Sequence, residues 1–152
     1  MAKLPMGLIG IVFAGLAGQA LAANTDTPRQ VAEATIAKWN EVVQRGRVDE
    51  IVALYTDNAM LLAPNGQVSK NPAEIRAFWQ ALLERRAGEY RFNVVEARDD
   101  KGDTVVTKAV LSNNQKLAHS AQTMHYHYDG ELFNVFKRQK DGSWKTEVQR
   151  WN

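Results

Sequence analysis

The spacing of apolar residues predicts a long first helix. From Ala32 to Val43, apolar side chains recur every three or four residues, which places them on one face of a helix. Thr27 and Pro28 provide an N-cap and a proline in the first turn, and Gly46 provides a C-terminal cap. We therefore expect one amphipathic helix between these caps.

Two further helices are expected on either side of one early strand. Residues 48–55 carry a second, shorter helical pattern, which ends before the turn-forming pair 57–58. The unbroken apolar run 59–63, closed by the turn residues 64–66, indicates a buried strand. Beyond it, 72–88 repeats the capping residues and the apolar spacing of an amphipathic helix.

The period of the pattern changes to two in the second half of the chain. Alternating residues predict strands over 90–94 and 105–111, and then over 132–137 and 144–151, each pair joined by a turn. Residues 113–130 fit either strand or loop. Helices gathered early and strands gathered late predict an α+β domain with a curved antiparallel sheet covered on one face by helices.

The N-terminus has the order of a secretory signal peptide. Lys3 precedes an apolar run over 6–16, and Ala20-Leu21-Ala22 presents small residues where a signal peptidase cleaves. The run is short for a membrane span, which needs about 20 residues. We expect residues 1–22 to be removed and residues 23–152 to be periplasmic or secreted as a single domain, with no membrane association after cleavage.

Composition restricts the partners. The chain has no cysteine, which excludes disulfides and a cysteine-linked lipid anchor. Its formal net charge is only +2, and the basic residues are interspersed with acidic ones. We therefore expect no nucleic-acid partner.

Three segments share the order and spacing of one known group of proteins. The first runs from Trp39-Asn40 past Gly46 to residues 51–55. The second consists of residues 57–66 together with 75–79, and the third is the closing segment 140–152. Together they resemble the nuclear transport factor 2-like superfamily, in its SnoaL-like and ketosteroid-isomerase-like branch. The resemblance implies a cystatin-like cone, in which a strongly bent antiparallel sheet wraps a long N-terminal helix and two further helices. It also implies an apolar pocket at the wide end and a homodimer formed through the outer sheet face.

The chain departs from the steroid isomerases of this superfamily at two functional positions. Those enzymes carry an acidic base just before the proline of the early strand and a phenol on the first helix. Here Ala63 and Trp39 stand at these positions, so neither the proton acceptor nor the phenol is present. Relatives often carry an acid where Gln149 stands. We therefore do not expect steroid isomerisation by that mechanism.

Two histidines offer a candidate for other chemistry. His125 and His127 are separated by one residue in an extended stretch, so both would face one side of a strand. A metal site normally needs a third protein ligand. The nearest candidates in the sequence are His119, Asp129 and Glu131. We expect no metal and no cofactor, and we expect His127 to be the residue involved if a histidine is catalytic.

Nine residues are candidates to line the pocket, by their place in the implied cone. They are Trp39, Tyr55, Met60, Tyr90, His127, Glu131, Asn134, Gln149 and Trp151. Strand alternation over 144–151 permits two orientations, one with Thr146 inward and one with Glu147, Gln149 and Trp151 inward. The resemblance favours Gln149 and Trp151 inward. Phe78 and Trp79 lie on the apolar stripe of their helix and are expected in the core.

Three functions follow, in order of preference. The first is an exported domain that holds a small apolar or aromatic molecule without turnover. The second is a lyase, isomerase or hydrolase that uses His127 with Glu131 or Asn134 as helpers. The third is a dimerisation or assembly module, like the kinase association domains of the same superfamily.

Overall fold

Helix α1 (Pro28–Arg45) begins and ends at the predicted caps. The Thr27 hydroxyl accepts a hydrogen bond from the Gln30 backbone N–H, and the Gln30 side chain accepts one from the Thr27 N–H. These two bonds form a capping box. Gly46 ends the helix at φ 65°, a left-handed conformation that glycine adopts without a steric penalty. The prediction for this helix is confirmed.

Within the part of the chain that the structure describes, six strands form one sheet, in the order β2-β1-β6-β5-β4-β3. The strands are β1 (Tyr55–Leu62), β2 (Val68–Ser69), β3 (Glu89–Asp100), β4 (Thr104–Lys116), β5 (His125–Arg138) and β6 (Trp144–Trp151). This computed structural model describes residues 26–85, 89–116 and 125–152. The segment 1–25, which holds the expected signal peptide, lies outside the described residues.

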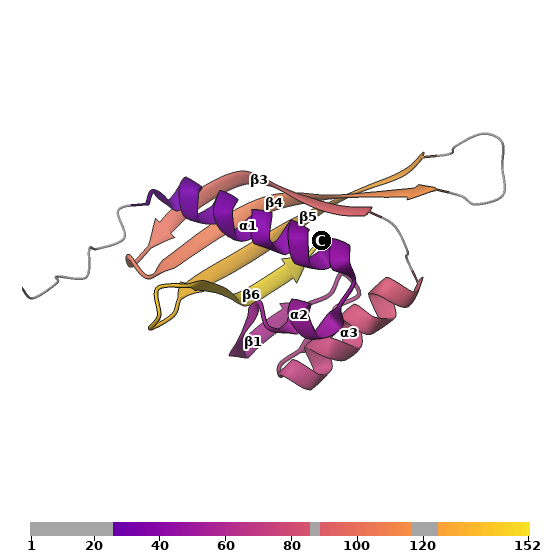
Figure 1. Ribbon diagram of the computed structural model, residues 1–152, viewed down its shortest axis with the longest axis horizontal. Helices are drawn as coiled ribbons and strands as arrows, with labels where there is room; N and C mark the ends of the chain where they lie inside the picture. The colour runs from indigo at the N-terminus through magenta and orange to yellow at the C-terminus, as the bar shows by residue number, and fades with distance from the viewer. Residues whose placement is uncertain (1–25, 86–88, 117–124) are drawn as a thin grey trace, which may run out of the picture.

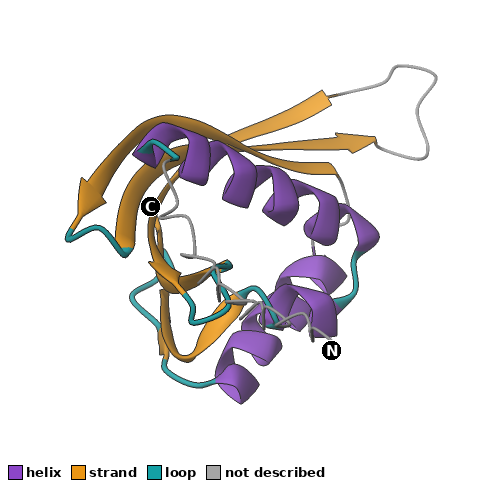
Figure 2. Cartoon of the chain, turned by 60° about the vertical axis from the view of Figure 1, so that its left-hand side comes forward, coloured by secondary structure: helices purple, strands orange, loops and turns teal. Residues whose placement is uncertain are grey.

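The sheet curls around α1, while α2 (Val48–Val52) and α3 (Pro72–Arg85) lie beside β1 (Figure 1). Figure 2 shows the curvature from the side, with α1, α2 and α3 on the inner face of the sheet. The α+β fold class and the bent sheet on a long first helix are thus confirmed. Among the described residues, no helix combines the length and hydropathy that a membrane crossing requires.

One pair of strands differs from the predicted antiparallel sheet. Strands β1 and β6 run parallel, whereas every other neighbouring pair is antiparallel. A parallel pair needs a long crossover, and here the whole segment between the two strands provides it. The alternation of apolar and polar residues within a strand does not show which strand it pairs with or in which direction. The two-residue strand β2 was also not predicted.

The early part of β1 was assigned wrongly. The sequence pattern predicts Tyr55 at the end of a helix and 57–58 in a turn, but all of them lie in β1. The pairing of β1 with β6 shifts register between Tyr55 and Met60, so these polar residues form an irregular stretch inside a strand. Such bulges accept turn-forming residues within a sheet.

Strands β4 and β5 are longer than predicted. They pair continuously from Thr104↔Lys137 to Lys116↔His125, so 113–116 and 125–130 are strand rather than loop. Residues 117–124 lie outside the described residues, as do the side chains of 113–129.

A bulge in β6 decides which of its residues face inward. The pairing with β5 passes over Glu147, which is an extra residue relative to β5. Thr146 before it and Gln149 and Trp151 after it are therefore all buried. Neither simple alternation is right on its own. The inward placement of Gln149 and Trp151 is confirmed.

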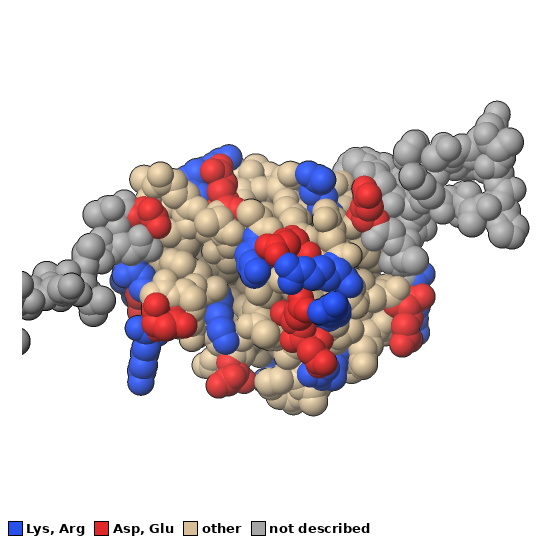
Figure 3. All heavy atoms as spheres, in the orientation of Figure 1, with Lys and Arg blue, Asp and Glu red and all other residues tan. Residues whose placement is uncertain are grey.

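Charged side chains of both signs are mixed on the surface. On the face in Figure 3, acidic and basic groups lie next to one another, without a broad patch of one sign. Arg45, for example, pairs with both Glu41 and Glu50. This distribution agrees with the low net charge of the chain.

Candidate functional site

Aromatic side chains fill the interior between α1, α3 and the sheet. The ring of Trp39 lies 5.1 Å from Tyr55, 5.7 Å from Trp79 and 6.1 Å from Phe92, measured between centroids. All four side chains are buried. The pairs with Tyr55 and Phe92 are edge-to-face, whereas the Trp79 ring is tilted by 33°. Each edge-to-face pair contributes about 0.5–1.5 kcal/mol beyond the burial of its area. The centre of the cone is therefore packed core rather than an open pocket.

A chain of hydrogen bonds runs through this cluster. Trp79 Nε1 donates to the Tyr55 hydroxyl at 3.0 Å, and that hydroxyl donates to Gln149 Oε1 at 2.6 Å. The same oxygen accepts from Trp151 Nε1 at 2.9 Å, while Gln149 Nε2 donates to Asn134 Oδ1 at 3.1 Å. These five residues, called the Gln149 network below, come from α3, β1, β5 and β6. They satisfy one another's buried polar atoms.

The Gln149 network is suited to hold side chains in place rather than to transfer protons. Tyr55 is its one titratable member, and burial raises the pKa of this hydroxyl above its ordinary value, although the hydrogen bond from Trp79 acts in the opposite direction. The hydroxyl therefore stays protonated at neutral pH. The other members are amides and indoles, which do not change their protonation state in the physiological pH range.

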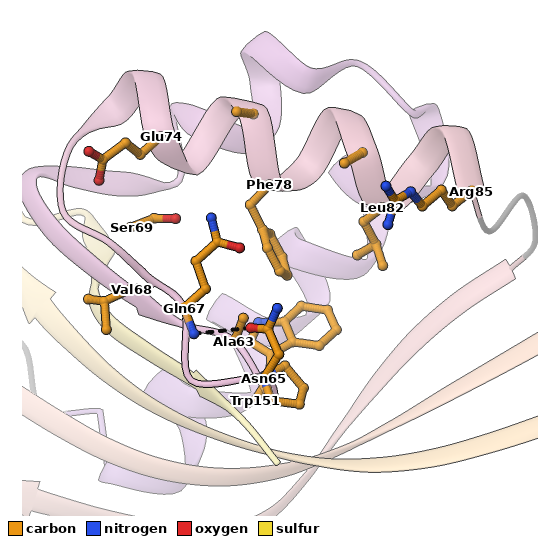
Figure 4. Close-up of a pocket in the computed structure, with 13 residues that line it drawn as sticks. Ala63, Asn65, Gln67, Val68, Ser69, Glu74, Phe78, Leu82, Arg85 and Trp151 are labelled. Carbon is orange, nitrogen blue, oxygen red and sulfur yellow. Dashed lines mark hydrogen bonds between the residues drawn. The ribbon is translucent and has the colours of Figure 1, made fainter.

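A cavity of about 670 Å³ lies between α3 and the hairpin of β1 and β2 (Figure 4). This volume falls within the range of about 300–1,000 Å³ that is typical of small-molecule sites. Its apolar wall comes mainly from Phe78 and Leu82 on α3, Val68 on β2 and Trp151 on β6. The cavity is the candidate functional site.

Phe78 and Trp151 form the inner wall of the cavity. Their ring centroids are 5.5 Å apart at an interplanar angle of 65°. The indole N–H of Trp151 is bound to Gln149, so the network behind the wall fixes the orientation of this ring. The interior network and the cavity are thus connected through one side chain.

Polar groups lie around the edge of the cavity. Ser69, Gln67 and Asn65 come from the hairpin side, where Asn65 Oδ1 accepts a hydrogen bond from the Gln67 backbone N–H at 3.0 Å. Glu74 and Arg85 come from opposite ends of α3 (Figure 4). Among the described lining residues, Glu74 is the only carboxylate and Arg85 the only cation.

The position of the missing base lies on the cavity. Ala63 and Pro64 both line it, at the end of β1. The resemblance implied an acidic group at this point, but the Ala63 side chain has no titratable atom. The cavity therefore lies beside the position that the resemblance assigns to the isomerase base, and this chain has no base there.

The predicted pocket residues divide into several groups. Trp151 lines the cavity. The interior holds Trp39, Tyr55, Tyr90, Asn134 and Gln149, all of which are buried. For His127, the backbone pairs with Asn114 in the β4–β5 ladder, and its side chain lies outside the described residues.

The inward placement of two candidates is wrong. Met60 is 38% exposed, because it alternates along β1 with the buried residues Ala59 and Leu61. Glu131 alternates in the same way on β5, and its carboxylate pairs with Lys108 Nζ at 2.8 Å with half of its side chain exposed. Both side chains therefore point away from the interior.

Within the described ranges, no three histidine, aspartate or glutamate side chains gather as a metal site would require. The side chains of His125, His127 and Asp129 lie outside the described residues, and so does His119. The expectation of a histidine pair on one side of β5 therefore stays a prediction.

Sequence reasoning missed most of the cavity wall. Phe78 was assigned to the core with Trp79, and Trp79 is indeed fully buried. Phe78 is only partly buried, because it packs against the core and also lines the cavity. The available signal was the spacing of Glu74, Phe78, Leu82 and Arg85, which lie on one face of α3.

Comparison with known proteins places this geometry in a family. Residues 36–146 match the family model described as a SnoaL-like domain. A search of curated proteins found no significant match. The chain is similar in structure to a ketosteroid isomerase-like protein from Erwinia carotovora atroseptica SCRI1043. The TM-score is 0.66 at 16% identity, and the match covers 80% of this chain and 92% of the other.

Two further solved structures are similar. A domain of unknown function with a cystatin-like fold from Nostoc punctiforme has a TM-score of 0.65 at 16% identity, covering 82% of this chain and 76% of the other. An NTF-2 like protein of unknown function from Shewanella oneidensis MR-1 has a TM-score of 0.65 at 15% identity, covering 82% and 98%. These likenesses concern the fold. With the family match, they establish that the chain belongs to the SnoaL-like domain family of the nuclear transport factor 2-like superfamily.

Proposed function

We propose that this protein binds a small apolar or aromatic molecule in the cavity between α3 and the β1–β2 hairpin, without turning it over. The observation that carries the proposal is the inner wall of the cavity. Two aromatic rings, Phe78 and Trp151, meet there at 5.5 Å beside aliphatic side chains. Flat apolar ligands bind to such surfaces by burying their area and by ring contacts.

Binding without catalysis fits the chemistry of the lining. Ala63 stands where the related isomerases carry a base, and the Tyr55 hydroxyl behind the wall is held neutral by burial. Glu74 is already engaged at the start of α3, where its carboxylate accepts the Lys70 backbone N–H at 2.7 Å. A general acid or base needs a titratable group within reach of the ligand.

The family supports the same general role. SnoaL-like domains bind small molecules or act as ketosteroid isomerase-like enzymes. The enzyme alternative for this chain depends on His127, whose side chain lies outside the described residues. Export of the domain rests on the signal-peptide pattern of residues 1–22 and stays part of the proposal.

The test uses N-phenyl-1-naphthylamine, an uncharged aromatic probe whose fluorescence rises in apolar sites. We expect it to bind the wild-type protein at one site. In Ala81→Phe a new ring occupies the cavity, since Ala81 lines it, and the affinity should fall at least about tenfold, a loss of roughly 1.4 kcal/mol. The measurement is a fluorescence titration.

The matched control is Ala73→Phe, which makes the same change on the same helix at a position that does not line the cavity. It should bind the probe like the wild type, and both variants should keep a cooperative thermal transition. Equal probe affinity in Ala81→Phe and the wild type would show that the cavity is not the binding site. Absence of binding to the wild type would contradict the proposal directly.

A further inference from the structure

The cavity has two chemically different ends. Glu74, Phe78, Leu82 and Arg85 are spaced by four, four and three residues along α3, so they share one helical face. Eleven residues separate Glu74 from Arg85, which corresponds to about 16 Å along the helix axis. The apolar wall of the cavity lies between them (Figure 4).

The acidic end is already used by the protein. The Glu74 carboxylate accepts the Lys70 N–H at 2.7 Å, and the Glu74 N–H donates to Asn71 Oδ1 at 2.9 Å. These bonds satisfy backbone groups at the start of α3. A ligand would therefore have to compete with the helix cap for this carboxylate.

The basic end has no such partner. Within residues 26–85, 89–116 and 125–152, no carboxylate pairs with the Arg85 guanidinium and no hydrogen bond engages it. In Figure 4 this group lies beside Leu82, at the end of the apolar wall. Arg76, on the same helix, is instead paired with Asp49. Arg85 is thus the lining group left available to a ligand.

A guanidinium at the edge of an apolar surface favours carboxylates. It presents parallel N–H donors that match the two oxygens of a carboxylate, and its charge is less screened beside apolar groups than in open water. The C-terminus of α3 carries roughly half a negative charge, which opposes an anion there. The full positive charge of Arg85 exceeds it.

From this arrangement we infer that the ligand is an aromatic carboxylate, with its ring against Phe78 and Trp151 and its carboxylate bound by Arg85. This inference rests on the proposed function and adds the ligand's chemical class. Seven residues separate Phe78 from Arg85, about 10 Å along the axis. A bicyclic ring with one carboxylate, together with the reach of the arginine side chain, spans this distance.

The experiment compares 2-naphthoate with 2-naphthamide, which has the same ring system and no charge. Binding to the wild type, Arg85→Gln and Arg76→Gln is measured by calorimetry at pH 7.5. We expect the wild type to bind the carboxylate about five- to tenfold more tightly, as one charge-assisted hydrogen-bonded pair allows. Arg85→Gln should remove that preference and leave the affinity for the amide unchanged. Added salt should reduce the preference in the wild type.

Arg76→Gln removes the same charge from the same helix outside the cavity lining, so it should retain the preference. Equal affinity for both compounds in the wild type would overturn this inference and leave the proposed function standing. Loss of the preference in Arg76→Gln would also overturn it, because the effect would then come from overall charge. Failure of the wild type to bind either compound would overturn both proposals.

Discussion

Gln149 shows how one neutral side chain connects the core to the cavity. Its Oε1 accepts from Tyr55 and Trp151, and its Nε2 donates to Asn134 Oδ1. A carboxylate at this position would accept from the same two donors, but it would place an oxygen against the Asn134 oxygen. The amide is therefore the side chain that satisfies all three neighbours, and through Trp151 it fixes the cavity wall.

The hydroxyl of Tyr55 is the first test of this network. Tyr55→Phe leaves the Trp79 indole N–H without its acceptor and takes one donor from Gln149. The free energy of unfolding at neutral pH should fall by about 1–3 kcal/mol, as is typical when a buried group is left unsatisfied. Urea unfolding of the variant and the wild type measures the difference.

The difference in unfolding free energy between the wild type and Tyr55→Phe should depend on pH. Burial raises the pKa of Tyr55 in the folded state, so above about pH 10 the unfolded chain releases this proton and the folded protein retains it. The stability that Tyr55 adds is present below that pH and is lost as the pH rises above it, by about 1.4 kcal/mol per pH unit. The difference in unfolding free energy between the wild type and Tyr55→Phe should therefore become smaller as the pH rises above about 10. A constant gap up to pH 11 would contradict this.

At the scale of elements, α1 protects the edge of the sheet. Strand β3 is an edge strand, whose outward backbone groups would otherwise be free to pair with another chain. The Asn40 side chain donates to the Phe92 carbonyl at 2.9 Å and accepts the Phe92 N–H at 2.7 Å. Farther along, Arg29 donates to the Val95 carbonyl at 3.1 Å. The helix thus takes the place of a neighbouring strand.

Removal of the Asn40 side chain should loosen this edge. Asn40→Ala breaks both hydrogen bonds to Phe92, and we expect it to cost about 1–3 kcal/mol of unfolding free energy. The amide of Phe92 should also exchange with solvent faster, which hydrogen exchange followed by NMR measures. Lys38→Ala, at an exposed position of the same helix, is the control and should leave that amide protected. Unchanged exchange in Asn40→Ala would disprove the role of this contact.

At the scale of the whole molecule, the face of the sheet opposite the helices is the surface through which the resemblance implies a homodimer. Phe133 on β5 is 37% exposed there, beside the ion pair of Lys108 and Glu131. An exposed aromatic ring within a polar surround is typical of interface centres. The homodimer expected from the resemblance stays a prediction.

Light scattering tests that prediction. We expect the wild type to be a dimer and Phe133→Glu to weaken self-association at least about tenfold, because a charge would be buried at the interface. Ala37→Glu adds the same charge at an exposed position of α1 and should remain dimeric. A monomeric wild type at high concentration would disprove the homodimer.

Local patterns predicted the elements well and their boundaries less well. The capping box at Thr27 and the stripe of α1 depend on residues three or four apart, so they are readable in the sequence. Tyr55 was misplaced because a helical pattern and an irregular strand look alike over a few residues. Met60 and Glu131 lie on the outer face because strand parity, which the resemblance alone does not fix, directs their side chains away from the interior.

The amino-acid sequence by itself determined the capped first helix, the α+β class and the absence of a base at Ala63, since each depends on residue identity or on neighbours a few positions away. The tertiary structure decided the parallel pairing of β1 with β6, the bulge at Glu147 and the cavity under α3. These features arise where segments distant in the chain compete for the same interior volume, and no local pattern records the result of that competition.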